Sequence, residues 1–233
     1  MTDRVDEIIQ NALREGRSAL LEPEAKRICN EYQIRTPASR LVSSSSEAVK
    51  AAKSLGFPVV LKIVSPDIPH KTEAKCVILN LRNGTEVKRS FSEIIDNARH
   101  HATNATIRGI LVEKMLAPGT EVIVGSLREP GLGQAVMFGL GGVFVEVFED
   151  VSFRLAPLRE HDARSMIREI KGYEILKGHR KQEPADEESL VKIILSVSRL
   201  VRDHAEISEM DLNPTVVYRK RAIVADARMS LGR

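Results

Sequence analysis

Along this chain the spacing of apolar residues alternates between two patterns. In six stretches apolar residues recur every three or four positions, which is the spacing of an amphipathic helix. In the third stretch Ser46 is placed to cap the N-terminus and Gly56 to end the helix. The predicted helices begin near Val5, Pro23, Ser46, Val87, Ala163 and Leu190.

The second pattern consists of short β-branched runs bounded by Gly, Pro or Asn, which is typical of strands. Strands occur both in clusters and interleaved with helices, so the pattern predicts an α+β fold. Ser65–Lys75, which contains two prolines, is predicted to be a polar, mobile loop, and Asn83-Gly84 to be a turn. The predicted strands cover residues 58–64, 76–81, 109–116, 121–127, 133–140 and 143–148, followed by a terminal hairpin over 207–231.

The composition excludes several classes of protein. With 42% apolar and 29% charged residues, the 233-residue chain can bury a sizeable core. Lys and Arg number 35 against 32 Asp and Glu, which is too balanced a charge to indicate nucleic-acid binding. Trp is absent and the six Phe and three Tyr are scattered, so no platform for stacking single-stranded bases is predicted.

Cysteine content and hydropathy bear on the cellular location. Cys29 and Cys76 are too few for a zinc site and a poor disulfide framework, so a reducing cytoplasm fits better. The first ten residues lack the apolar core of a signal peptide. The most apolar stretch, residues 132–148, is too short and too polar to span a bilayer. We therefore expect a cytoplasmic protein without a membrane partner.

Three charged residues interrupt predicted strands. Lys62 lies within an apolar run, Glu113 interrupts another run, and Glu121 opens a third. Burying such a group alone costs on the order of several kcal/mol, so each needs an ionic partner or a polar ligand. For any one of them, an edge strand with its charged face in water remains open as an alternative. Three together favour a polar cleft between sheets.

The terminal hairpin contains a geometric argument for a metal site. A turn centred on residues 219–220 places Asn213 across from Asp226, and cross-strand Cβ atoms lie about 4.5–5.5 Å apart. An amide oxygen and a carboxylate oxygen could then share one Mg²⁺, which prefers oxygen ligands. Asp211 precedes Asn213 by two residues and is expected on the same face of the strand. The alternative that residues 211–214 form only a turn remains open.

His70 occupies the middle of the proline-containing loop. A neutral imidazole is a competent nucleophile near pH 7. A loop histidine can equally be an ordinary surface residue. The glycines of residues 139–142 match no phosphate-binding fingerprint and are explained as well by a tight hairpin.

Four segments resemble, in order and over nearly the whole chain, the β subunit of ADP-forming acyl-CoA (NDP-forming acetyl-CoA) synthetases. They read FPVVLKIVSPDIPHKTE, ILVEKMLAPGTEVIVG, VMFGLGGVFVEVFEDVSFRLAPL and EMDLNPTVV. The resemblance implies an ATP-grasp fold, in which two α+β subdomains grip a nucleotide. We expect the N-terminal lobe, with the His70 loop, over residues 21–109 and the C-terminal lobe over 1–20 plus 110–233.

The resemblance also implies roles on the nucleotide side. Lys62 would hold the nucleotide phosphates. Glu113, Lys114 and Met115 would form the hinge whose backbone meets the adenine edge. Glu113 or Glu121 would bind the ribose hydroxyls.

On the phosphoryl side, Asn213 and Asp226 match the magnesium ligands of the family. His70 matches the phosphohistidine of a swinging loop, and Asp211 would orient or stabilise it. The family loop carries two glycines where this chain has Lys75-Cys76, which puts the path of the loop in question.

The implied reaction is a relay. An acyl phosphate forms from acyl-CoA and phosphate on a CoA-binding α subunit, whose histidine takes the phosphoryl group. His70 then carries it to Mg-ADP, giving ATP, reversibly. The implied partner is that α subunit, in an α2β2 heterotetramer.

Three other functions are compatible with an ATP-grasp fold. The chain could be a regulatory or scaffolding subunit with a degenerate site, but it retains Lys62, His70, Asn213 and Asp226 together. It could be the β subunit of a ligase similar to succinyl-CoA synthetase. A carboxylate–amine ligase of the ATP-grasp class would need no loop histidine.

Overall fold

The computed structural model describes residues 2–142, 149–178 and 183–232, with side chains from Arg4 onward. The strand expected at 143–148 lies outside the described residues. The chain divides into two compact units, each with its own core. Unit 1 consists of Met1–Thr36 and Pro118–Arg233, and unit 2 of Pro37–Ala117.

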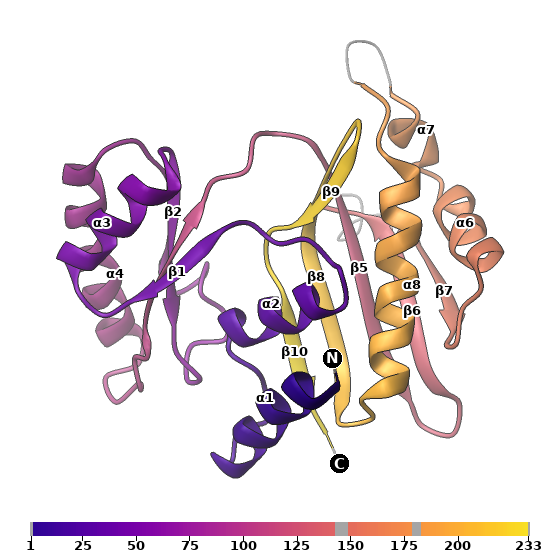
Figure 1. Ribbon diagram of the computed structural model, residues 1–233, viewed down its shortest axis with the longest axis horizontal. Helices are drawn as coiled ribbons and strands as arrows, with labels where there is room; N and C mark the ends of the chain where they lie inside the picture. Colours follow the sequence, from indigo (N-terminus) through magenta and orange to yellow (C-terminus); the bar gives the residue numbers. More distant parts are fainter. Residues whose placement is uncertain (1, 143–148, 179–182, 233) are drawn as a thin grey trace. The chain divides into compact units, whose positions relative to one another are not determined.

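Unit 2 is a four-stranded antiparallel sheet with two helices against one face (Figure 1). The strand order is β1-β4-β2-β3, so that β2 and β4 occupy the centre. The elements are β1 (Ser39–Val42), α3 (Ser45–Leu55), β2 (Val59–Val64), β3 (Val77–Leu81), α4 (Gly84–His101) and β4 (Gly109–Lys114).

The two helices of unit 2 begin at capping side chains. Ser44, not the expected Ser46, caps α3 by accepting from the Glu47 N–H at 3.3 Å. Asn83 caps α4 by accepting from the Glu86 N–H at 2.9 Å, so Asn83-Gly84 opens a helix and not the predicted turn. The first correction arises because residues 43–46 are all serines that can cap, and the second because an Asn that can form a turn can also cap a helix.

Unit 1 contains a six-stranded antiparallel sheet, and α6 and α8 pack against it (Figure 1). The order is β10-β8-β5-β6-β7, and β9 pairs with β8. The elements are α1 (Thr2–Arg14), α2 (Glu22–Glu31), β5 (Thr120–Glu129), β6 (Gly133–Leu140), β7 (Val151–Leu155), α6 (Glu160–Glu169), α7 (Tyr173–Leu176), α8 (Glu187–Asp203), β8 (Ile207–Tyr218), β9 (Arg221–Val224) and β10 (Arg228–Leu231).

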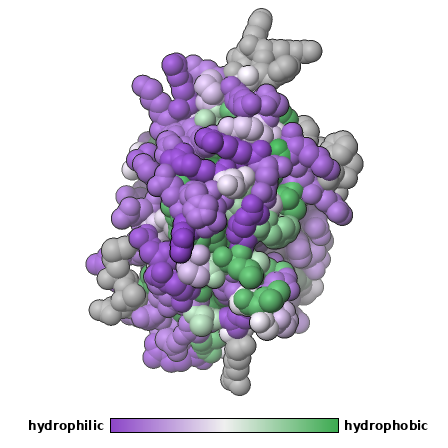
Figure 2. All heavy atoms as spheres, turned by 90° about the vertical axis from the view of Figure 1, so that its right-hand side faces the viewer, coloured by the Kyte–Doolittle hydropathy of each residue, from purple (hydrophilic) through white to green (hydrophobic). Residues whose placement is uncertain are grey.

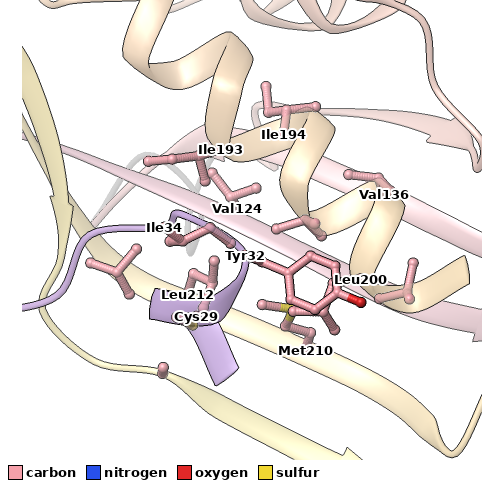
Figure 3. Packing of buried hydrophobic residues seen from close by; sticks show 14 of the residues in the cluster. Cys29, Tyr32, Ile34, Val124, Val136, Ile193, Ile194, Leu200, Met210 and Leu212 are labelled. Carbon is pink, nitrogen blue, oxygen red and sulfur yellow. The ribbon is translucent and has the colours of Figure 1, made fainter. Parts of the chain in front are cut away.

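The core of unit 1 lies between the sheet and its helices. Ile194 and Leu200 of α8 are fully buried with Val124 and Val136 of the sheet (Figure 3). The ring of Tyr32, which follows α2, lies in the same cluster. Its hydroxyl donates to the Asp203 carboxylate at 3.1 Å and lies 2.9 Å from His204 Nε2. These polar contacts tie the end of α2 to the end of α8.

The unit boundaries differ from the lobe boundaries expected at 20/21 and 109/110. Residues 21–36 belong to unit 1, because Ala25, Ile28 and Cys29 of α2 are fully buried in its core. Residues 110–117 belong to unit 2, because β4 pairs with both β1 and β2.

The surface seen in Figure 2 is mostly hydrophilic, with a smaller group of apolar side chains. Large exposed apolar residues of unit 1 include Leu127, Leu132, Phe153 and Leu155. No helix in the described part of the chain has the length and hydrophobicity needed to cross a bilayer.

Candidate functional site

Lys62 and Glu113 form a buried ion pair in the sheet of unit 2. Val60 faces Glu113 across β2 and β4, which puts Lys62 on the diagonal position of the same sheet face. Lys62 Nζ lies 3.1 Å from Glu113 Oε1, and the side chains are only 8% and 3% exposed. Because β2 and β4 are central strands, the edge-strand alternative is wrong for both residues.

The predicted hinge segment is tied into unit 2 by its N–H groups. Lys114 N–H donates to the Ala38 carbonyl at 2.9 Å, and Met115 N–H donates to the Pro58 carbonyl at 3.2 Å. The Lys114 ammonium donates to the carbonyls of Gly56 and Phe57, at 2.8 and 3.0 Å. In this structure Lys114 therefore ties β4 to the end of α3.

The loop between β2 and β3 carries His70 at an exposed position. Ile68, Ala74 and Cys76 anchor the loop in the core of unit 2. Ala74 N–H donates to the His70 carbonyl at 3.1 Å, and Cys76 N–H donates to the Lys71 carbonyl at 2.8 Å. The His70 side chain is nevertheless 61% exposed. The loop is thus anchored by buried residues while its imidazole stays accessible to solvent.

The end of this loop takes a left-handed backbone turn. Lys75 has φ +53°, in the region that favours glycine, and it occupies the first of the two positions where the resembling family has glycine. A non-glycine residue there costs about 1–2 kcal/mol. The Asn97 amide donates to the Lys75 carbonyl at 2.8 Å and holds the turn. The backbone at position 75 is therefore left-handed although the residue is lysine.

The terminal hairpin has the register that the sequence predicts. Tyr218 faces Arg221 across a two-residue turn, and further along Asp211 faces Arg228. Between these stretches the second strand is interrupted at residues 225–227, which include Asp226. The second arm of the predicted hairpin is therefore divided into two strands, β9 and β10, and both pair with the long strand β8.

The carboxyl group of Asp211 lies in an electronegative setting. Its Oδ1 is buried and has no hydrogen-bond partner among the described residues. The pKa of Asp211 is raised to about 6, chiefly by burial and also by the charges of Asp226 and Glu209, while Arg228 lowers it. Asp226 thus acts electrostatically on Asp211, as expected for residues around one hairpin interruption.

This donor set fits a small, hard divalent cation. Carboxylate and amide oxygens are the ligands that Mg²⁺ prefers, usually one or two of them together with substrate phosphates. Asn213 is exposed, Asp226 is partly exposed, and the buried Asp211 Oδ1 has no hydrogen-bond partner among the described residues. Within the described ranges no three His, Cys, Asp or Glu residues cluster as a metal centre, so any cation here would need ligands of other kinds.

Glu121 belongs to unit 1, whereas Lys62 and Glu113 belong to unit 2. Its side chain is exposed on β5, a central strand, and its carbonyl accepts from the Gly141 N–H at 2.9 Å. A Cβ on Gly141 would lie 3.1 Å from Glu121 Cβ, so the glycine permits close approach. Of the two glutamates considered for ribose, Glu121 has the accessible carboxylate.

Sequence reasoning missed the ion pair of Glu22 and Lys26 on α2. Both side chains are nearly fully buried, and their charged atoms are 2.8 Å apart. The available signal was a Lys–Glu pair at i,i+4 beside the apolar residues Ala25 and Cys29, on the face of the helix that enters the core.

The sequence matches the ATP-grasp domain family over residues 11–231, which places the chain in the ATP-grasp class of proteins. It is 48% identical over 227 residues to "Acetate--CoA ligase [ADP-forming] II subunit beta" of Pyrococcus furiosus, covering 96% of both chains. The chain therefore belongs to the family of ADP-forming acetate–CoA ligase β subunits, which are subunits of acid–thiol ligases.

Solved structures agree with this assignment. A dinucleotide-forming acetyl-coenzyme A synthetase 1 of Ca. Korarchaeum cryptofilum, in complex with coenzyme A and Ca-AMPCP, superposes with a TM-score of 0.95. The identity is 48%, and the match covers 97% of this chain and 99% of that one. A second structure of that enzyme, with coenzyme A and Mg-AMPPCP, has a phosphohistidine segment pointing towards the nucleotide binding site. It matches with a TM-score of 0.87 and 45% identity, over 98% of this chain and all of that one.

Proposed function

We propose that this chain is the nucleotide-binding β subunit of an ADP-forming acyl-CoA synthetase and that His70 carries the phosphoryl group. The observation that carries the proposal is the imidazole of His70, exposed on a loop whose flanking residues are buried. A nucleophile that meets a phosphoryl donor and then ADP has to be accessible, and its carrier has to keep a defined shape.

The chemistry at His70 has two steps. An imidazole nitrogen attacks the phosphorus of the donor, the bond to the donor's leaving atom breaks, and a phosphorus–nitrogen bond forms. A terminal oxygen of ADP then attacks the same phosphorus, the phosphorus–nitrogen bond breaks, and ATP leaves with neutral imidazole regenerated. Glu73 Oε1 lies 3.8 Å from His70 Nδ1, too far for a hydrogen bond but close enough to act electrostatically.

The other residues would position the nucleotide. Lys62 would hold the phosphates, the segment from Glu113 to Met115 would meet the adenine, and Glu121 would bind the ribose. Asn213 and Asp226 would hold Mg²⁺, which when bound offsets negative charge on the phosphate oxygens. Asp211 would face the incoming phosphohistidine and favour its orientation.

The comparisons support this proposal over the alternatives. The related Korarchaeum enzyme has a named phosphohistidine segment and binds a magnesium–nucleotide analogue. A degenerate regulatory subunit or a carboxylate–amine ligase would have no use for an accessible His70.

The β-subunit name of the relatives supports a partner chain, which we propose to be a CoA-binding α subunit in an α2β2 assembly. The two buried free thiols, Cys29 and Cys76, support a cytoplasmic location.

Labelling with γ-³²P-ATP and Mg²⁺ tests the role of His70. The chain should acquire a base-stable, acid-labile label, as expected of a phosphoramidate. His70→Ala should abolish the label.

His100→Ala is the matched control, because His100 is an exposed histidine of the same unit at the end of α4. It should label like the wild type. Equal labelling of His70→Ala and the wild type would remove His70 from the mechanism.

A further inference from the structure

A buried ion pair on α2 contacts the segment that carries Asp226. The side chains of Lys26 and Glu22 are 3% and 4% exposed, and Lys26 Nζ lies 2.8 Å from Glu22 Oε1. The same Nζ donates a hydrogen bond to the carbonyl oxygen of Ala225, also at 2.8 Å. Lys26 therefore binds the peptide group that joins Ala225 to Asp226.

The Ala225 residue is held on its other side by β8. Its N–H donates to the carbonyl of Pro214 at 2.9 Å, and Pro214 directly follows Asn213. The chain of contacts that runs from Glu22 through Lys26 and Ala225 to Pro214 thus reaches the residues next to both predicted metal ligands. It passes through the interruption between β9 and β10, where Ala225 keeps one backbone hydrogen bond to β8 and Asp226 lies outside both strands.

Stability of α2 alone does not account for a charge at position 26. Burying an ion pair carries a desolvation penalty of about several kcal/mol per ion, and well-packed apolar residues are often as stable in its place. The neighbouring residues Ala25, Ile28 and Cys29 are apolar and fully buried, so an apolar side chain would suit this helix face. What an apolar residue would not supply is a donor for the Ala225 carbonyl.

We propose that Lys26, held by Glu22, is a positioning residue for the metal ligand Asp226. It fixes the Ala225–Asp226 peptide and thereby the direction in which the Asp226 carboxylate leaves the backbone. The inference rests on the proposed function, because it takes Asp226 as a ligand of the divalent cation. Residues that orient metal ligands typically change metal affinity about 10- to 100-fold when they are removed.

Binding of Mn²⁺ in the presence of ADP, followed by the electron paramagnetic resonance signal of the free ion, tests the inference on the whole chain. Lys26→Met should weaken Mn²⁺ binding about 10- to 100-fold and leave metal-free ADP binding unchanged. Lys26→Arg, which keeps a donor, should recover part of the loss. Arg27→Met, on the exposed side of the same helix, should bind Mn²⁺ like the wild type.

Asp226→Ala separates this inference from the proposed function. If Asp226→Ala loses Mn²⁺ affinity while folded Lys26→Met binds Mn²⁺ like the wild type, Lys26 has no positioning role. If Asp226→Ala also binds Mn²⁺ like the wild type, Asp226 is not a metal ligand. In that case both the proposed metal pair and the inference about Lys26 are wrong. If Lys26→Met does not fold, the Glu22→Gln variant tests the inference instead. Weaker Mn²⁺ binding by Glu22→Gln at an unchanged melting temperature supports the positioning role of Lys26, and unchanged Mn²⁺ binding overturns it.

Discussion

At the scale of single residues, the Asp211 carboxyl group makes the stability of the metal-free protein depend on pH. Burial, together with Asp226 and Glu209, raises its pKa from the ordinary 3.8 to about 6. Between these values the unfolded chain gives up the proton more readily than the folded chain. The free energy of unfolding therefore falls as the pH rises from about 4 to about 6, and it stays lower above that range.

Asp211→Asn should remove the loss of stability that the wild type shows above pH 6. We expect the variant to melt at a higher temperature than the wild type at pH 7.5 in the presence of a chelator. A gain of about 1 kcal/mol corresponds to a shift of about 2–4 °C for a domain of this size. Most of the difference should disappear at pH 4, where the wild-type carboxyl group is protonated in the folded state and close to half protonated in the unfolded chain. Melting curves followed by circular dichroism between pH 4 and pH 8 measure it.

Asp203 supplies a control of opposite sign. Although burial opposes the effect, hydrogen bonds from Arg202 and Tyr32 lower the pKa of Asp203. Its contribution to stability is present above the ordinary pKa and is lost as the pH falls through the depressed one. Asp203→Asn should therefore melt at a lower temperature at pH 7.5. An equal loss in Asp211→Asn would contradict the argument for Asp211.

At the scale of elements, the Lys62–Glu113 pair connects the two central strands of unit 2. Lys62→Met would leave a buried carboxylate without its ammonium, and Glu113→Gln would leave a buried ammonium without its carboxylate. Each single change should lower the free energy of unfolding by about 3–5 kcal/mol. The double variant should lose clearly less than the sum of the two. Urea unfolding of all four proteins gives the coupling energy.

Glu121→Gln is the matched control for this cycle. Glu121 also lies on a central strand, but its side chain is exposed, so the change should stay within about 0.5 kcal/mol of the wild type. Strictly additive losses from Lys62→Met and Glu113→Gln would mean that the two charges do not stabilise each other.

The elements also show which features a sequence can predict. Helices with a clear apolar spacing, such as α8, were predictable because their signal is local. The register of β8 with β9 and β10 was predictable because a turn at residues 219–220 fixes the later pairs as far as Ser230, after which the register shifts. The contact of Lys26 with Ala225 was not, because it joins residues 199 positions apart. The assignment of α2 to unit 1 was missed for the same reason.

Part of the candidate site could also be predicted from local sequence patterns. Lys62 and Glu113 were recognisable as charges inside apolar strands, but their mutual pairing depends on which strands become neighbours. The exposure of His70 depends on the anchoring of Ile68 and Ala74, which polar loop residues around them do not reveal. The metal pair of Asn213 and Asp226 follows from the spacing of the hairpin, whereas the roles of His70 and Asp211 as phosphoryl carrier and its positioning residue come from the resemblance.

At the scale of the whole molecule, the chain matches a β subunit over nearly its full length. The β-subunit name of its relatives supports our proposal that the nucleotide half-reaction and the CoA half-reaction take place on different chains, with the His70 loop as the link between them.

This division predicts that the half-reactions can be separated in the test tube. The purified chain with Mg-ATP should become phosphorylated yet form no acyl-CoA from acetate and CoA, because the acid and CoA would bind on the partner. Adding the α subunit should restore acyl-CoA synthesis, measured by coupled ADP release, and should discharge the label from the phosphorylated chain. His70→Ala with the α subunit should restore neither. Synthesis of acyl-CoA by this chain without any partner would contradict the split and would require a CoA site within its own 233 residues.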